Sequence, residues 1–170
     1  LSRLFSAQLD DDRWLTPERM EQGRLFGLGL QLTNILKDYE RDADRGISYI
    51  PPRWIRDHDG RPALTPRGSR SLVGRALEHF DAAQRYVLSL PRTRPDMRQF
   101  CLWAQHLALA TLYLVASRGT SSEPAKVSRE DLSLILGRAE RHVDDDRGLD
   151  HLYQGYREAV VTALDALGPA

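Results

Sequence analysis

Polar side chains recur at steps of three and four residues in the segment 27–52, which begins as an apolar helical run. Gln31, Asn34, Asp38 and Asp42 hold these positions. In an α-helix such steps place side chains on one face. Asp38 and Asp42 are then one turn apart, roughly 6 Å along the axis at about 1.5 Å per residue. Two carboxylates at this spacing can point into the same space, so we predict a helix with a chemically active face.

This pair of carboxylates suits a magnesium ion. Mg²⁺ prefers oxygen ligands, keeps several waters and is commonly held by one or two carboxylates together with substrate phosphates. The amides of Gln31 and Asn34 can hydrogen-bond phosphate oxygens or metal-bound water, and Lys37 adds a positive charge. The spacing therefore predicts Asp38 and Asp42 as catalytic metal ligands and Gln31, Asn34 and Lys37 as substrate-binding residues.

A solvated helix face is the other interpretation of the same spacing. Arg41 and Arg45 follow Asp38 closely and can pair with carboxylates on the same helix. The amides favour the functional interpretation, because Gln31 and Asn34 stand among leucines and a buried amide needs a hydrogen-bond partner. The direction in which this face points separates the two interpretations.

The same residues resemble the second aspartate-rich motif of the squalene and phytoene synthases, the head-to-head prenyl transferases. That motif runs Gln, two residues, Asn, two residues, Arg or Lys, Asp, three residues, Asp, and this chain has it as QLTNILKDYERD, followed by Tyr49 and Pro51. The resemblance implies an all-α fold, an isoprenoid synthase-type helical bundle, of which residues 1–170 are the C-terminal part of one domain.

The resemblance also implies a reaction, most like that of squalene synthases. Two farnesyl diphosphates would condense head to head to presqualene diphosphate with Mg²⁺, and NADPH would reduce this product to squalene; Lys37 would contact the diphosphate or the NADPH. Phytoene or dehydrosqualene synthases, which do without NADPH, are an alternative, with geranylgeranyl diphosphate as a possible substrate. A non-catalytic helical interaction domain derived from such an enzyme is a second alternative. Ile47 motivates it, because the family usually has arginine there.

Two further segments resemble squalene synthases. FCLWAQHLALATL, residues 100–112, matches a family segment at Phe100 and Gln105, which implies that these two residues face the prenyl substrate. Aromatic rings can stabilise a carbocation, although an aromatic residue on an apolar helix is more often part of the core. Lys126 and Arg129 partly match a Lys-x-Arg motif that contacts NADPH phosphates, with Ser128 in place of its arginine. An equally good interpretation is that these two cations simply belong to a basic segment that leads into the helix beginning near residue 130.

Composition excludes several classes of protein. The 170 residues fit one domain, and 41% hydrophobic residues can form a core. The 24 basic and 24 acidic residues cancel, so nucleic-acid binding has no electrostatic support. A single cysteine, Cys101, fits a reducing compartment.

The longest apolar run, 107–116, is shorter than the ~20 residues of a membrane-spanning helix. We expect a cytoplasmic protein, with peripheral membrane association left open because a prenyl substrate is lipophilic.

Five or six helices are expected. They are predicted at residues 17–45, 65–90, 96–117, 130–142 and 149–167, after the end of a helix near residue 7. Thr16 and Pro17 are a typical N-cap and first helical residue, and Gly46 is a typical stop. No β-alternation of useful length is present. LSRLF, residues 1–5, resembles a segment well inside squalene synthases, so we expect the chain to lack the family's first aspartate-rich motif and, alone, to be inactive or nearly so.

Overall fold

The computed structural model describes residues 1–58, 60–118 and 125–167. Within these ranges the chain is mostly helical, as predicted, with a short β-hairpin. The helices are α1 (Ser2–Leu9), α2 (Pro17–Ala43), α3 (Pro66–Leu88), α4 (Pro95–Ser117), α5 (Arg129–Arg141) and α6 (Asp146–Asp165). Two single turns of 3₁₀-helix (Asp12–Trp14 and Pro52–Trp54) and two antiparallel strands, β1 (Ile55–His58) and β2 (Arg61–Leu64), complete the described elements.

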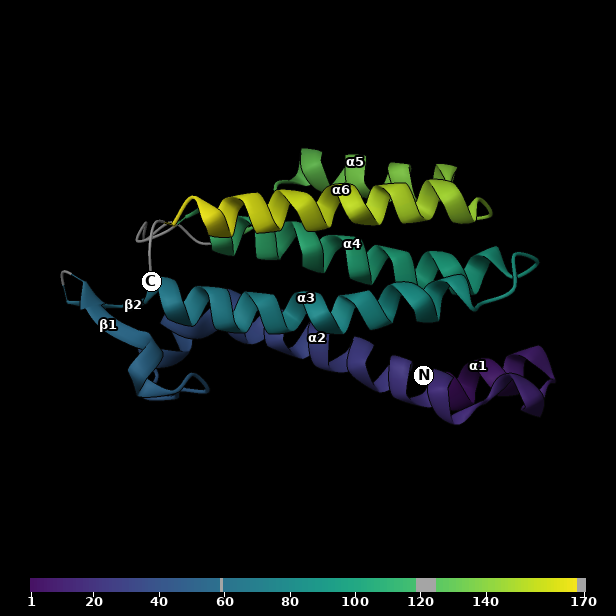
Figure 1. The fold of residues 1–170 in the computed structure, drawn as a ribbon, viewed down its shortest axis with the longest axis horizontal. Helices are drawn as coiled ribbons and strands as arrows, with labels where there is room; N and C mark the ends of the chain where they lie inside the picture. Colours follow the sequence, from purple (N-terminus) through teal and green to yellow (C-terminus); the bar gives the residue numbers. More distant parts are fainter. Residues whose placement is uncertain (59, 119–124, 168–170) are drawn as a thin grey trace.

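The long helices lie side by side, and α4 is at the centre of the bundle (Figure 1). α2 packs mainly on α3, while α4 contacts α2, α3, α5 and α6. α2 and α4 run in the same direction and α3 runs in the opposite one, so the C-terminal ends of α2 and α4 lie at the same end of the molecule (Figure 1). The β-hairpin also lies at that end.

Side-chain caps explain where the helices begin. The Thr16 hydroxyl accepts a hydrogen bond from the backbone N–H of Arg19 at 3.2 Å, and Pro17 is the first residue of α2, as the sequence predicts. Asp145 caps α6 in the same way, so this helix begins three residues earlier than expected. Gly46 adopts a φ of 75°, a conformation that favours glycine, just after α2 has ended.

The hairpin was not expected from the sequence. Each strand has four residues, and only Ala63 and Leu64 are buried. Such short strands are below the length at which alternation identifies a strand. Gly60, at a φ of 77°, lies in the turn between them.

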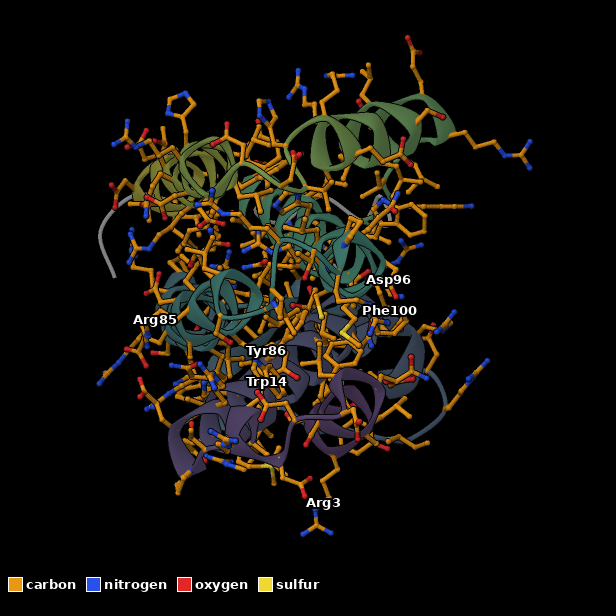
Figure 2. The ribbon with its side chains drawn as sticks, turned by 90° about the vertical axis from the view of Figure 1, so that its right-hand side faces the viewer. Arg3, Trp14, Arg85, Tyr86, Asp96 and Phe100 are labelled. Carbon is orange, nitrogen blue, oxygen red and sulfur yellow. The ribbon has the colours of Figure 1, made fainter. Side chains whose placement is uncertain are left out.

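Aromatic rings from α2 and α3 form much of the core. The ring of Phe26 lies 6.4 Å from the rings of both Phe80 and Tyr86, and Trp14 meets Tyr86 edge-on at 5.8 Å. Figure 2 shows Trp14 and Tyr86 together in the interior. Gly29 permits this close packing, because a Cβ at this position would lie 3.3 Å from the Phe80 ring.

The helix α4 is long and apolar enough to cross a membrane by length and composition. The apolar run 107–116, taken alone, was too short to suggest this. However, 56% of its most apolar 18-residue window is buried inside the bundle. Arg98 is also buried in α4, where its Nε donates to the Leu90 carbonyl at 2.9 Å and a terminal nitrogen lies 2.8 Å from the Asp146 carboxylate. These contacts are those of a core helix of a folded bundle.

His106 is a fully buried side chain of α4. Its ring packs against Tyr156 of α6 at 5.1 Å, and neither ring nitrogen has a hydrogen-bond partner among the described residues. Burial disfavours the charged imidazolium and lowers the pKa of His106 to about 4. The folded state therefore keeps this side chain neutral.

We expect His106 to make the protein less stable in mild acid. The unfolded chain takes up the proton near pH 6.5, whereas the folded chain takes it up only near pH 4, so stability falls as the pH decreases between these values. The loss amounts to about 3 kcal/mol at 1.36 kcal/mol per pKa unit. Urea unfolding from pH 7 to pH 4 should show this loss in the wild type and a smaller one in His106→Leu. Equal pH dependence of the two proteins would contradict the assignment.

Candidate functional site

The predicted motif lies on the outward side of α2. Phe26, Leu36 and other core residues occupy one side of this helix, whereas Gln31 and Asn34 are exposed on the other. The expectation that these two amides are buried among leucines is therefore wrong. The reason is that several neighbouring aliphatic residues, Leu30 and Leu32 among them, are themselves only partly buried, and Leu28 is 40% exposed. No partner is required for an amide that water can reach, so the direction of this face agrees with the solvated helix face, and burial does not support the functional interpretation.

The carboxylate of Asp38 is paired within its own helix. Arg41 lies 2.9 Å from one carboxylate oxygen and Lys37 lies 3.4 Å from the other, while the Asp38 side chain is 23% exposed. The local pairing that the sequence left open is thus present. Such exposed pairs are worth less than about 1 kcal/mol, so a ligand can displace them at little cost. Asp42, one turn later, is half-buried.

The two carboxylates fit one kind of metal site. They supply two oxygen-bearing groups one turn apart on an accessible face, which suits a magnesium ion that keeps its waters and shares a phosphorylated substrate. They do not fit a metal ion enclosed by protein ligands. Among the residues that the structure describes, no group of three or more His, Cys, Asp or Glu side chains could hold a metal ion.

Arg118 and Glu40 fix the C-terminal ends of α4 and α2 to each other. The Arg118 guanidinium lies 2.5 Å from a Glu40 carboxylate oxygen and 5.1 Å from the centre of the Tyr39 ring. The Arg118 side chain is only 9% exposed, which strengthens the pair relative to a surface contact. Sequence reasoning missed this contact because the partners are 78 residues apart and no local spacing relates them. The contact therefore fixes how far α4 is displaced along its axis relative to the motif in α2.

The two residues of α4 that resemble the prenyl-binding segment lie on different sides of the helix. Phe100 is 58% exposed and meets Phe5 of α1 edge-on, with 6.4 Å between ring centres. Gln105 is completely buried, and its amide nitrogen lies 3.4 Å from the Gln84 side-chain oxygen of α3. The structure therefore does not place Phe100 and Gln105 on one common surface.

Three large apolar side chains of α4 form an exposed strip. Phe100, Trp103 and Leu107 follow each other at helical steps and are 58%, 37% and 37% exposed. At about 1.5 Å per residue, Leu107 and Phe100 lie roughly 16 and 27 Å along α4 from Arg118. The strip thus extends away from the end of α2 that carries Asp38.

The two basic residues that were predicted to contact NADPH lie at the start of α5. Lys126 and Arg129 are both exposed, and Arg129 is the first residue of the helix. The hydroxyl of Ser128 accepts from the Asp131 backbone N–H at 3.0 Å and caps α5. The serine that replaces the motif's arginine therefore has a structural role. α5 packs mainly on α4.

Comparison with known proteins identifies the family. The family model described as squalene/phytoene synthase matches residues 2–131. The phytoene synthase of Pseudescherichia vulneris is 36% identical over 85 residues, which cover 46% of this chain and 26% of that protein. The squalene synthase of Homo sapiens is 33% identical over 121 residues, 66% of this chain and 28% of that protein. The presqualene diphosphate synthase of Sinorhizobium fredii is 29% identical over 126 residues, 66% of this chain and 43% of that protein.

These relatives extend well beyond the matched region. The chain spans from about a quarter to less than half of their length. The matched residues include all of α1 to α4, and hence both the acidic pair and the apolar strip. The chain is therefore part of an isoprenoid synthase fold and belongs to the squalene/phytoene synthase family of head-to-head prenyl transferases.

Proposed function

We propose that the enzyme containing this chain joins two prenyl diphosphates head to head in a magnesium-dependent reaction, and that the polar face of α2 binds the diphosphate. The observation that carries the proposal is the position of Asp38 and Asp42. They lie one turn apart on an accessible helix face, inside the segment that matches the family. Their pairing is local and weak, so a metal-diphosphate complex can replace it.

The surroundings of the acidic pair suit a substrate with two chemically different ends. The diphosphate would lie at the end of α2 where Asp38 and Lys37 stand. The prenyl tail would extend along α4, over Leu107 and Trp103 toward Phe100. Arg118 holds the two helix ends together, and the apolar strip begins roughly 16 Å farther along α4 and leads away from that end.

Each polar residue of the face has a proposed task. Asp38 and Asp42 would hold magnesium, which neutralises the diphosphate leaving group. Gln31 and Asn34 would orient the diphosphate by hydrogen bonds from their amides, and Lys37 would contact its oxygens. Apolar walls would keep water from the reacting carbon atoms.

Ile47 leaves one position of the motif without its usual arginine. The Ile47 side chain is 43% exposed and cannot contact a phosphate. Arg53 stacks on the Trp54 ring at 4.8 Å and is engaged there, whereas Arg45 is exposed one residue before Gly46. Arg45 is therefore the better candidate to replace the missing contact.

We further propose that the rest of the enzyme covers the polar face and the strip. The relatives are two to four times longer than the matched region, and an accessible site cannot exclude water from a carbocation. This chain alone should then have little or no turnover. A cytoplasmic location with peripheral membrane contact is part of the same proposal, because the substrate is lipophilic.

Squalene synthesis is the proposed activity within the family. It is supported by the longer match to squalene synthases, 121 residues against 85 for a phytoene synthase, and by sequence resemblance to squalene synthases at Phe100, Gln105, Lys126 and Arg129. Farnesyl diphosphate is then the substrate. Phytoene synthesis is the second candidate, favoured by the 36% identity of that shorter match and by Ser128.

Asp38→Asn should abolish activity without unfolding the protein. In the full-length gene product we expect kcat/KM to fall on the order of 10²-fold or more, because an electrostatic contact to the leaving group is lost. The free energy of unfolding should change by less than roughly 1 kcal/mol, as for other exposed pairs. Glu21→Gln is the matched control, since Glu21 pairs with Arg24 at the same i,i+3 spacing of α2 as Asp38 with Arg41.

Full activity of Asp38→Asn would contradict the assignment of the metal ligand. It would instead support the second class of function, a non-catalytic interaction domain, for which neither the Asp38 carboxylate nor magnesium matters. Loss of activity in Glu21→Gln as well would show that the assay reports general damage to α2.

Substrate and cofactor tests should separate the two candidate reactions. With Mg²⁺ and farnesyl diphosphate, the full-length gene product should make squalene when NADPH is present and presqualene diphosphate when it is absent. Product analysis by gas chromatography and mass spectrometry measures this. Phytoene made from geranylgeranyl diphosphate without NADPH would overturn the choice of squalene but not the family reaction.

A further inference from the structure

The last turn of α2 carries one of the two proposed metal ligands. α2 ends at Ala43, so Asp42 lies one residue from its end, whereas Asp38 lies a full turn deeper. The Asp42 carbonyl closes this turn by accepting the backbone N–H groups of Arg45 and Ile47, at 3.0 and 2.9 Å. Terminal turns of helices open more readily than central ones. The position of Asp42 therefore depends on what holds this turn.

Core packing holds α2 only as far as Tyr39. Leu36 and Tyr39 are 0% and 6% exposed and anchor the helix in the bundle. Of residues 40–49, all of which the structure describes, none is buried, and the next buried side chain is that of Ile50. The last turn of α2 thus contributes no side chain to the core.

Glu40 connects this turn to α4. Its carboxylate accepts a hydrogen bond from the Arg118 guanidinium at 2.5 Å, and the guanidinium also lies 5.1 Å from the centre of the Tyr39 ring. The Arg118 side chain is 9% exposed, whereas the Arg41 side chain that pairs with Asp38 is 63% exposed. Water and salt screen a buried pair less than an exposed one. The contact with α4 is therefore the stronger of these two pairs.

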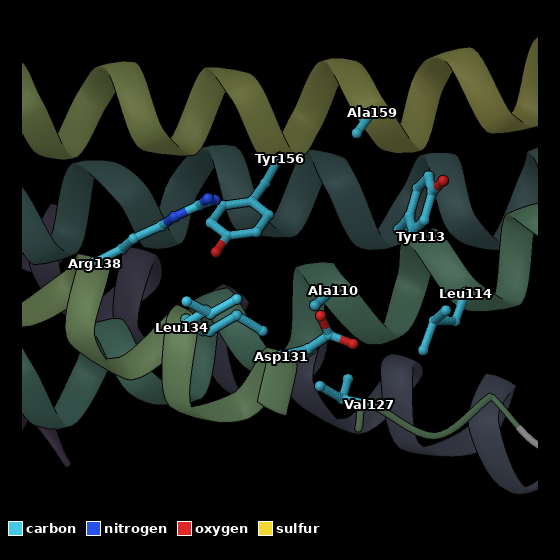
Figure 3. A pocket seen from close by; sticks show the side chains of 10 residues that line it. Ala110, Tyr113, Leu114, Val127, Asp131, Leu134, Arg138, Tyr156 and Ala159 are labelled. Atoms are coloured by element: carbon cyan, nitrogen blue, oxygen red, sulfur yellow. The ribbon is translucent and has the colours of Figure 1, made fainter. Parts of the chain in front are cut away.

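α4 is a fixed support for Arg118. The Arg118 backbone N–H donates to the Leu114 carbonyl at 3.1 Å, and Val115 and Ala116 of the same turn are buried. Leu114 also lines the hollow between α4, α5 and α6 (Figure 3), and α5 and α6 both pack on α4. A guanidinium carried by this central helix holds the Glu40 carboxylate at a fixed place.

We propose that Arg118 is a positioning residue of the diphosphate site. Through Glu40 it keeps Asp42 in place, one turn from Asp38. The proposal rests on the function proposed for α2. Because Glu40 lies two residues from each aspartate, about 200° around the helix at 3.6 residues per turn, it faces away from the metal and does not bind it. Mg²⁺ demands nearly ideal octahedral geometry, so a last turn that opens leaves Asp38 alone to hold the ion.

Hydrogen exchange in the full-length gene product, followed by mass spectrometry, tests the support of the last turn. In Arg118→Gln we expect the amides of residues 44–47, which close this turn, to exchange about tenfold faster or more, because a hydrogen bond between charged groups is lost. Residues 26–36 should exchange as in the wild type. Arg157→Gln is the matched control, since it removes an ion pair of 3.0 Å with Asp81 that joins α6 to α3, away from α2.

Manganese binding in the presence of inorganic diphosphate, followed by electron paramagnetic resonance, tests the link to the metal. Arg118→Gln should weaken Mn²⁺ binding about tenfold or more, as expected when a group that orients a metal ligand is removed. Arg118→Lys keeps the positive charge and should recover most of the affinity. The magnesium concentration for half-maximal activity should shift in the same way, while kcat at saturating magnesium stays near the wild-type value. Arg157→Gln should change none of these quantities.

Unchanged exchange of residues 44–47 in Arg118→Gln would overturn the proposal. Equal loss of Mn²⁺ affinity in Arg157→Gln, or a kcat of Arg118→Gln that stays low at saturating magnesium, would do the same, since either points to general damage. Asp38→Asn separates this inference from the proposed function. If Asp38→Asn loses Mn²⁺ binding and Arg118→Gln does not, the diphosphate site stands and the positioning role is wrong. If neither variant loses it, both are wrong.

Discussion

The rotation of α2 about its own axis decides where the functional residues of this chain lie. Gly29 lets the helix approach α3 closely, since a Cβ there would lie 3.3 Å from the Phe80 ring, and Phe26 packs into the same aromatic cluster. Burying a phenylalanine side chain contributes about 1.5–3 kcal/mol, whereas turning an amide toward water costs little. These contacts direct the opposite side of the helix outward, and Gln31, Asn34 and Asp38 lie there.

A second constraint acts along the helix axis. The contact of Arg118 with Glu40 and Tyr39 fixes how far α4 is displaced along α2. α4 then has three different environments around its circumference. It is buried against α2 and α3, packs on α5 and α6, and exposes the strip that contains Phe100 and Trp103.

Local features of the fold could be predicted from the sequence, and non-local ones could not. Thr16, Pro17 and Gly46 bound α2 because caps and stops depend on adjacent residues. The spacing of Asp38 and Asp42 likewise needs only the helical repeat. The burial of Gln31 and Asn34 was predicted wrongly, because leucines occur around much of the helix and the sequence does not show which of them face α3. The contact of Arg118 with Glu40 and the β-hairpin depend on tertiary packing in the same way.

The most direct test of the account is where a metal ion binds in the full-length protein. Manganese can replace magnesium and is located by its anomalous X-ray scattering, so crystals grown with Mn²⁺ and inorganic diphosphate would show the position of the ion. The account predicts an anomalous peak within metal-ligand distance, about 2.0–2.2 Å, of carboxylate oxygens of Asp38 and Asp42, the range of Mg²⁺ sites and similar ions. Manganese-diphosphate bound elsewhere, with Asp38 still paired to Arg41, would contradict it.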